Sequence, residues 1–279
     1  MAPIARTEHV PAETRPKLED GWSRDTPPQD TILRQFLYNQ AELNAAIALA
    51  MGGRAVDVSG AFIADAGSQV PYMNQALLTR PAQRSDDPVY SDVESFFDTR
   101  GGPATLLSLW PTADLWHRGW ILYGHPVLVV KPPVLAGNDL PDGVSVEVVN
   151  DLGSLLEAER ILIEGFPIGD PDEIHDQPDP STVLGPGVLD TNLTVRLGLV
   201  DGEPVATGCS YVSHGVVNLA MAATRPAARR RGVWQALVRA RMDDGPGMPA
   251  VAYTSDLSRP GFLTMGFLPI MRLTLWGRG

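Results

Sequence analysis

The stretch from residue 222 to residue 238 constrains the fold more than any other. An apolar run ends at Thr224, Pro226 marks a turn, and a helical pattern starts near Gly232. The apolar residues of that pattern recur at the spacing of one helix face: Val233, Ala236, Leu237 and Ala240. A strand that leads through a short loop into an amphipathic helix is typical of a sheet covered by helices. We therefore expect an α/β chain.

The loop of this stretch is rich in arginine. The chain has 20 Arg and 2 Lys, and six of the arginines fall between residues 225 and 241. The N-terminus of a helix presents free backbone N–H groups and positive potential, which suits a phosphate or pyrophosphate. Gly232 allows close approach of such a ligand, and arginine side chains add charge-assisted hydrogen bonds. A helix start that is merely solvated is the alternative that composition leaves open.

The overall charge limits the partners. The formal net charge is −11 and the sequence pI is about 4.8, which argues against a general nucleic-acid binder. The single cysteine, Cys209, cannot form an internal disulfide, so we expect a reduced, cytoplasmic setting. No stretch approaches the length of apolar sequence that a membrane helix needs, and no histidine spacing predicts a metal site.

The second half of the chain has a clear order of elements. The expected strands cover 144–149, 193–199, 205–212, 215–223, 251–254 and 270–276. The expected helices cover 152–163 and 232–242, and a further short helix precedes the last strand. This order, β-α-β-β-β-α-β-α-β, predicts an α/β (α+β) mixed sheet with helices on its faces.

The first half is less distinctive. We expect a polar, proline-rich arm over 1–28, a domain over 29–137, a linker over 136–143 and a second domain over 144–279. The first domain has a helix over 30–51, short strands, a helix near 92–98 and a strand pair within 119–130. No short repeat stands out between the halves, which share only a loose order of elements.

Two motifs of the second half resemble signatures of the GNAT N-acetyltransferase superfamily. The acyl-CoA signature [Gln/Arg]-x-x-Gly-x-[Gly/Ala] is matched by Arg229-Arg-Arg-Gly232-Val-Trp234, after the lead-in Thr224-Arg-Pro226. Downstream, Pro260-Gly-Phe-Leu-Thr-Met-Gly-Phe267 resembles the second signature of the family, an aromatic residue four positions before Gly-Phe. The resemblance covers residues 144–276. It implies a GNAT acyl-CoA N-acyltransferase fold, in which the first half is either a degenerate GNAT-like copy, making a tandem, or an unrelated α/β cap.

The chain departs from the family pattern at two positions. Trp234 stands where the family has a small residue, so the pyrophosphate cradle is expected to be narrower or its indole to point away. Phe262 stands where many members have a tyrosine that protonates the leaving thiolate, and Phe has no proton to give.

The resemblance implies direct transfer of an acetyl group from acetyl-CoA to an amine, carried by a small molecule or a peptide. The residues implied in acetyl-CoA binding are Ala222, Ala223, Thr224, Arg229, Arg230, Arg231, Gly232, Val233 and Trp234. The strand amides among them are expected to polarise the thioester carbonyl. The candidates for the base are Glu164, Tyr253 and Asp256. A catalytically inactive CoA-binding or interaction module is the alternative, and a homodimer is left open.

Overall fold

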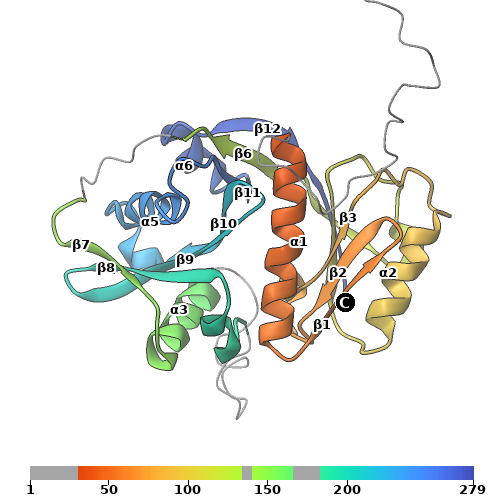
Figure 1. The fold of residues 1–279 in the computed structure, drawn as a ribbon, viewed down its shortest axis with the longest axis horizontal. Helices are drawn as coiled ribbons and strands as arrows, with labels where there is room; N and C mark the ends of the chain where they lie inside the picture. The colour runs from red at the N-terminus through yellow and green to blue at the C-terminus, as the bar shows by residue number, and fades with distance from the viewer. Residues whose placement is uncertain (1–30, 134–139, 166–182) are drawn as a thin grey trace, which may run out of the picture.

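The computed structural model describes residues 31–133, 140–165 and 183–279. The predicted arm at 1–28 and the residues at 166–182 lie outside this part, and the predicted linker lies partly outside it. Two mixed sheets form the body of the molecule, and a long helix lies between them (Figure 1). No helix among the described residues is long and apolar enough to cross a membrane.

The first sheet has six strands in the order β1-β2-β3-β4-β13-β5. Their bounds are Arg54–Val58 (β1), Ala61–Asp65 (β2), Asn74–Leu78 (β3), Ala104–Ser108 (β4), Thr274–Arg278 (β13) and Ile121–Gly124 (β5). The helices of this part are α1 (Ile32–Ala50) and α2 (Pro88–Asp98), with short 3-10 helices at Pro71–Met73 and Trp116–Arg118. Helix α2 covers the outer face of the sheet, and α1 covers the face turned toward the second sheet.

The second sheet has seven strands in the order β12-β6-β11-β10-β9-β8-β7. Their bounds are Leu268–Arg272 (β12), Val127–Lys131 (β6), Ala250–Thr254 (β11), Val216–Thr224 (β10), Glu203–Ser213 (β9), Leu193–Val200 (β8) and Val144–Val148 (β7). Helices α3 (Leu152–Gly165), α5 (Val233–Met242) and α6 (Arg259–Thr264) pack around it, with 3-10 helices at Pro186–Asp190 and Pro226–Ala228. The Asp151 side chain accepts a hydrogen bond from the Ser154 N–H, which confirms the predicted start of α3.

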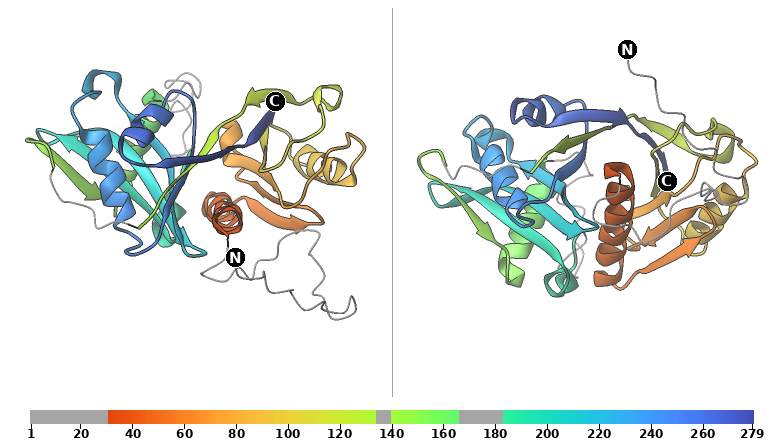
Figure 2. Two further views of the ribbon diagram at one scale, coloured as in Figure 1. Left: turned by 90° about the horizontal axis from the view of Figure 1, so that it is seen from above. Right: turned by 45° about the horizontal axis from the view of Figure 1, so that its top comes forward.

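The two sheets exchange a strand. Strand β6 precedes the predicted linker, yet it lies between β11 and β12 of the second sheet. Strand β13, the last of the chain, lies between β4 and β5 of the first sheet. Figure 2 shows both strands passing between the two bodies. The two sheets therefore do not coincide with the halves on either side of the predicted linker, and the single strand expected at 270–276 is two strands in two sheets.

The sheets repeat one topology. In the first sheet β3 runs parallel to β4, and all other neighbours are antiparallel. In the second sheet β10 runs parallel to β11 and the remaining neighbours are again antiparallel. In each case a helix, α2 or α5, joins the parallel pair. The mixed α/β class and the tandem arrangement are thus confirmed, and the first unit is a second copy rather than an unrelated cap.

A short sequence repeat accompanies this topology. Thr79-Arg80-Pro81-Ala82 follows β3, and Thr224-Arg225-Pro226-Ala227 begins at the last residue of β10. In both copies an arginine stands two residues later, Arg84 or Arg229. Four identical residues are too few to stand out in the chain alone. They become meaningful because both copies connect equivalent strands to equivalent helices.

Candidate functional site

The parallel strands β10 and β11 separate soon after they meet. They pair only at Val217 with Ala250 and at Asn218 with Val251. Beyond that point the pairing of β10 with β9 shifts between Ala220 and Ala223, and Met221 has a φ of +43°. A bulge of this kind bends a strand and re-aims its backbone groups. Strand β3 of the first unit has a regular register against β2, so the bulge distinguishes the second unit.

The loop that follows β10 leaves several backbone N–H groups free. Arg230 has a φ of +66°, and Gly232 has a φ of +82° and serves as the N-cap of α5 without a side-chain hydrogen bond. Among the described residues, the N–H groups from 230 to 235 donate to no backbone carbonyl. These donors converge at the positive end of the helix dipole. Gly232, Val233 and Trp234 thus form a site that suits an anion.

The arginines around this loop differ in their availability. Arg229, Arg230 and Arg231 are exposed, and Arg231 forms an exposed ion pair with Asp201 at 2.7 Å. Arg225 instead turns away from the loop and binds Glu157 at 2.9 Å and Glu164 at 2.6 Å. Three consecutive arginines are thus exposed beside the N-terminus of α5, of which Arg229 also donates to the Thr224 carbonyl at 3.4 Å.

The end of β10 carries a buried polar atom that lacks a partner. Among the described residues, the Thr224 hydroxyl oxygen is buried and has no hydrogen-bond partner. Gly165 packs so closely on this segment that a Cβ there would lie 2.5 Å from the Ala223 Cβ and 3.4 Å from the Thr224 nitrogen. Ala222, Ala223 and Thr224 thus stand together beside the bulge, at the base of the loop. An unpartnered hydroxyl at a bulged strand end, beside the free amides of the following loop, is the kind of polar environment that the thioester end of an acyl-CoA needs.

The indole of Trp234 points toward α6. Its ring meets the Phe262 ring edge to face with centroids 4.9 Å apart, and a Cβ on Gly261 would lie 3.0 Å from it. Phe262 in turn packs on Phe267 with the same centroid distance. The Trp234 side chain therefore packs α5 against α6. Its backbone N–H remains among the free amides at the start of α5. Both departures from the family pattern are parts of one aromatic cluster.

Two of the base candidates are held by arginine. Both oxygens of the Glu164 carboxylate accept hydrogen bonds from Arg225, and Asp256 forms ion pairs with Arg259 at 2.7 Å and Arg272 at 3.4 Å. Both carboxylates are thus already engaged in ion pairs within the protein. Within the part of the chain that the structure describes, the ion pairs of Glu164 and Asp256 are with arginines outside residues 229–234.

Tyr253 lies on the opposite face of the sheet from α5. Its ring contacts Phe36 of α1 with centroids 6.3 Å apart. Burial raises the pKa of Tyr253, Tyr72 raises this pKa further, and a hydrogen bond with Gln75 lowers it in part. A raised pKa keeps the phenol protonated, so the environment favours a hydrogen-bond donor over a base. The structure thus does not bring the three base candidates together.

The chain contains residues whose roles sequence reasoning missed. Asp87, at the N-cap of α2, accepts a hydrogen bond from the Val89 N–H and a bidentate ion pair from Arg80. It stands where Gly232 stands in the second unit, so the N-terminus of α2 already holds a carboxylate. Arg241, in the last turn of α5, is fully buried, and its guanidinium donates to the carbonyls of Cys209 and Ala220 at the bulge. The short repeat was the signal that could have revealed Asp87.

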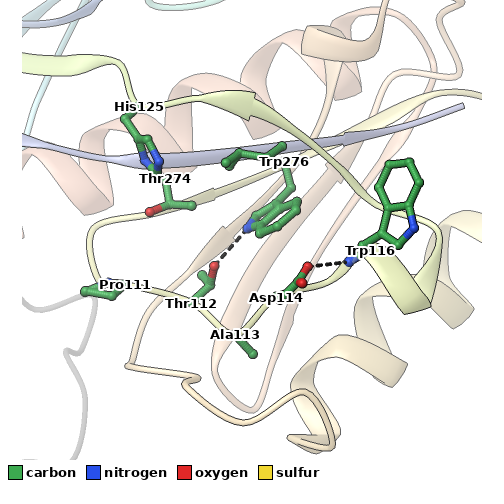
Figure 3. A pocket seen from close by; sticks show the side chains of 9 residues that line it. Pro111, Thr112, Ala113, Asp114, Trp116, His125, Thr274 and Trp276 are labelled. Atoms are coloured by element: carbon green, nitrogen blue, oxygen red, sulfur yellow. Dashed lines mark hydrogen bonds between the residues drawn. The ribbon is translucent and has the colours of Figure 1, made fainter.

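A cavity of about 570 Å³ lies elsewhere in the molecule (Figure 3). Nine residues line it: Pro111, Thr112, Ala113, Asp114, Trp116, Leu122, His125, Thr274 and Trp276. The Trp276 indole donates to the Thr112 hydroxyl at 2.8 Å, and the Asp114 carboxylate accepts from the Trp116 N–H at 3.0 Å. The cavity shares no residue with the loop and has no arginine in its lining, so it does not suit a pyrophosphate.

Solved structures resemble almost the whole chain. A GCN5-related N-acetyltransferase from Kribbella flavida has a TM-score of 0.59 at 18% identity, over 85% of this chain and 95% of its own. A conserved protein of unknown function from Staphylococcus epidermidis ATCC 12228 has a TM-score of 0.56 at 10% identity, over 80% and 92%. A GNAT-family protein from Novosphingobium aromaticivorans DSM 12444 has a TM-score of 0.51 at 16% identity, over 85% and 98%.

No protein-family model matches the chain, and no curated protein is similar to it in sequence. At the identities of the solved structures, the similarity establishes the fold. It confirms the fold that the motif at residues 229–234 predicts, and it extends that fold over both units.

Proposed function

We propose that this chain, whose fold is that of the GNAT acyltransferases, transfers an acetyl group from acetyl-CoA to an amine. The observation that carries the proposal is the N-terminus of α5. Its N-cap is a glycine without a side-chain hydrogen bond, its amides are free, and three exposed arginines adjoin it. These groups suit the CoA pyrophosphate, and the bulge of β10 beside them suits the thioester.

In the proposed reaction the neutral amine nitrogen attacks the thioester carbonyl carbon. A new C–N bond forms, the nitrogen loses a proton, and the C–S bond breaks, so the sulfur leaves as a thiolate that takes up a proton and becomes the CoA thiol. Backbone amides of residues 222–224 would stabilise the charge that develops on the carbonyl oxygen. Glu164, Tyr253 and Asp256 remain the candidates for proton transfer, and the environment of Tyr253 suits the role of a donor.

We assign acetyl-CoA binding to the second unit alone. In the first unit the Asp87 carboxylate occupies the N-terminus of α2, where it would repel a phosphate. Strand β3 also lacks a bulge. One acetyl-CoA per chain is therefore expected.

The first test gives α5 the type of N-cap residue that α2 has, an aspartate. Gly232→Asp would put a carboxylate at the N-terminus of α5, and we expect acetyl-CoA binding to weaken by about tenfold or more, measured by calorimetric titration. Gly232→Ala is the matched control, because its Cβ makes the same contact with the Pro141 ring, 2.6 Å from Cγ, at the same φ of +82° without adding a carboxylate. A second pair, Arg229→Glu against Arg84→Glu, changes the same charge at equivalent positions of the repeat. Unaltered binding in Gly232→Asp and Arg229→Glu would refute the assignment.

The second test separates an enzyme from a binding module. Phe262 is almost fully buried and brings no hydroxyl to the site, which favours a module that binds CoA without transfer. An assay of acetyl transfer to a panel of primary amines distinguishes the two functions. The transfer is measured as the release of the free CoA thiol. We expect transfer to at least one amine, lost together with acetyl-CoA binding in Gly232→Asp. Binding of acetyl-CoA with no transfer across the panel would favour the module.

A further inference from the structure

The bulge of β10 places two residues opposite one residue of β9. The pairing of the two strands is regular up to Ala220 with Cys209. After the bulge the register has moved by one residue, so Met221 and Ala222 together lie opposite Gly208. Met221 has a φ of +43°, a conformation that a residue with a side chain keeps only where its surroundings hold it. Neighbouring groups must therefore stabilise the bulge.

The guanidinium of Arg241 lies against this bulge. Its Nη1 donates to the carbonyl of Cys209 at 3.2 Å and to the carbonyl of Ala220 at 3.3 Å, the two residues of the last regular pair. Gly208, opposite the bulge, leaves room for it, since a Cβ there would lie 2.8 Å from the guanidinium carbon. One side chain of α5 thus binds both strands at the point where their regular pairing stops.

Arg241 is an unfavourable residue to bury at this place. It is fully buried, and among the described residues it forms no ion pair and its Nη2 has no hydrogen-bond partner. The Asp244 carboxylate, which influences the pKa of Arg241, is itself bound by Arg196 and by the Ser210 hydroxyl. An apolar side chain of similar size would avoid the cost of desolvating a charge. The hydrogen bonds to the bulge are what an apolar side chain could not provide.

The hydrogen bond to the Ala220 carbonyl also orients the next amide. The C=O of Ala220 and the N–H of Met221 belong to one planar trans peptide group, so they point in opposite directions. The pKa of Arg241, lowered by desolvation to about 10, still leaves the guanidinium positive at neutral pH. It therefore fixes this peptide group and polarises it. The amides of residues 222–224 follow directly on this fixed group.

Helix α5 thus contributes to both parts of the proposed donor site. Its N-terminus, at Gly232, presents the free amides that suit the pyrophosphate, and its last turn holds the bulge through Arg241. The Nε of Arg241 donates to the Leu237 carbonyl at 3.2 Å, which fixes the guanidinium relative to the helix. One helix therefore sets the position of the bulge relative to the anion site.

We propose that Arg241 is a positioning residue for the acetyl group. It holds the bulge of β10 in the geometry in which the amides of residues 222–224 reach the thioester carbonyl. This proposal rests on the proposed function. Because Arg241 is fully buried, it acts through the backbone rather than on the ligand. Its replacement should therefore weaken the hydrogen bonds to the acetyl carbonyl and leave the binding of the pyrophosphate unchanged.

The test uses acetyl-CoA with carbon-13 at the acetyl carbonyl, bound to the whole chain and observed by isotope-edited infrared spectroscopy. Hydrogen bonds lower the stretching frequency of a carbonyl, so we expect a lower frequency in the complex than in free acetyl-CoA. In Arg241→Met the frequency should return by about half or more toward the free value, while the Kd from calorimetric titration changes by less than about threefold. Arg241→Lys, which keeps a hydrogen-bond donor, should return less than Arg241→Met.

Two further variants separate positioning from general loss of stability. Gly208→Ala keeps the arginine but displaces its guanidinium, so it should shift the frequency in the same direction as Arg241→Met. Val238→Ala is the matched control, because Val238 is a fully buried residue of α5 that packs in the cluster with Phe262 of α6. This control should leave the frequency of the unaltered complex unchanged.

The outcomes against the proposal are distinct from those against the proposed function. An unchanged frequency in Arg241→Met, or in Gly208→Ala where the first variant does not fold, would overturn the proposal. An equal return in Val238→Ala, or a large loss of acetyl-CoA affinity together with the frequency change, would also overturn it. The same holds if the unaltered protein binds acetyl-CoA without lowering the frequency. Failure of the unaltered protein to bind acetyl-CoA would instead refute the proposed function.

Discussion

At the scale of single residues, the arginine cluster divides into groups with different tasks. Six arginines fall between residues 225 and 241, but Arg225 binds two glutamates and Arg241 is fully buried. Desolvation lowers the pKa of Arg241 to about 10. Gly208 leaves room for the guanidinium of Arg241, since a Cβ at this position would lie 2.8 Å from it. Arg241 thus holds the carbonyls of Cys209 and Ala220 at the bulge. The arginines suited to a phosphate are the exposed ones of the loop, Arg229, Arg230 and Arg231.

Cys209, beside Arg241, yields a prediction at this scale. Burial raises the pKa of its thiol to about 12, so the folded protein keeps the thiol protonated and inert. We expect a disulfide reagent to label the native protein at least about 1000-fold more slowly than the denatured protein, because the thiol is reached only through unfolding. Cys209→Ala, which lacks the thiol, provides the blank. Rapid stoichiometric labelling of native protein would contradict the buried position.

The same shift has a consequence for stability. The pKa of the Cys209 thiol is higher in the folded than in the unfolded chain. The contribution of this thiol to the free energy of unfolding is therefore fully present below about pH 8.5. It is lost as the pH rises from there toward 12, because only the unfolded chain then releases the proton. The free energy of unfolding should therefore fall more steeply with pH in this range than it does in Cys209→Ala.

At the scale of elements, two equivalent strand–loop–helix units have diverged. The N-cap of α5 is Gly232, which leaves the helix amides free, and the N-cap of α2 is Asp87, which uses them. The carboxylate of Asp87 also binds Arg80, the counterpart of Arg225 in the repeat. The N-terminus of α5 therefore leaves its amides available to an outside anion, while the N-terminus of α2 uses a carboxylate of its own chain.

Changes at Asp87 test this divergence. Asp87→Ala should lower the free energy of unfolding by about 1 kcal/mol, the usual cost of losing an N-cap, with a further loss from the ion pair with Arg80. Asp87→Asn keeps a capping side chain and should lose less. Both variants should still bind one acetyl-CoA per chain in a calorimetric titration, because β3 has no bulge. Binding of a second acetyl-CoA would show that the carboxylate alone closes the first unit.

At the scale of the whole molecule, the strand exchange makes two units into one structure. Strand β6 lies inside the second sheet and β13 lies inside the first, so removal of either would leave a gap in a sheet rather than a shortened edge. Helix α1 adds a chain of hydrogen-bonded side chains from Asn218 through Gln40, Asn44 and Gln75 to Thr105. Each sheet therefore depends on a strand that lies on the far side of the predicted linker.

This dependence predicts one cooperative unfolding transition. Urea unfolding followed by tryptophan fluorescence and by far-ultraviolet circular dichroism should give coincident curves, since neither unit keeps its sheet without the other. Leu275→Ala in β13 should shift both curves by the same amount, because Leu275 packs in the core shared with α1. Two separate transitions would mean that the units unfold independently.

The sequence by itself determined the local parts of this protein. Periodic apolar residues predict the helix that follows Gly232, and Pro226 and Gly232 predict the turn before it, because these signals act within a few residues. The order of elements and two short motifs were enough to predict the mixed sheet and the GNAT fold. The arginine-rich loop of residues 229–234 could be located from the sequence for the same reason.

Only the tertiary structure decided how distant parts meet. The exchange of β6 and β13, the occupation of α2 by Asp87 and the burial of Arg241 depend on contacts between residues far apart in the chain. The hydrogen bond from the Asn218 amide of β10 to Gln40 of α1 likewise joins the two units. No local propensity encodes these contacts, because they form only when both sheets close on α1. The sequence thus predicts which loop would bind acetyl-CoA, and the packing of the two units on α1 decides which residues of the first unit lie near the second.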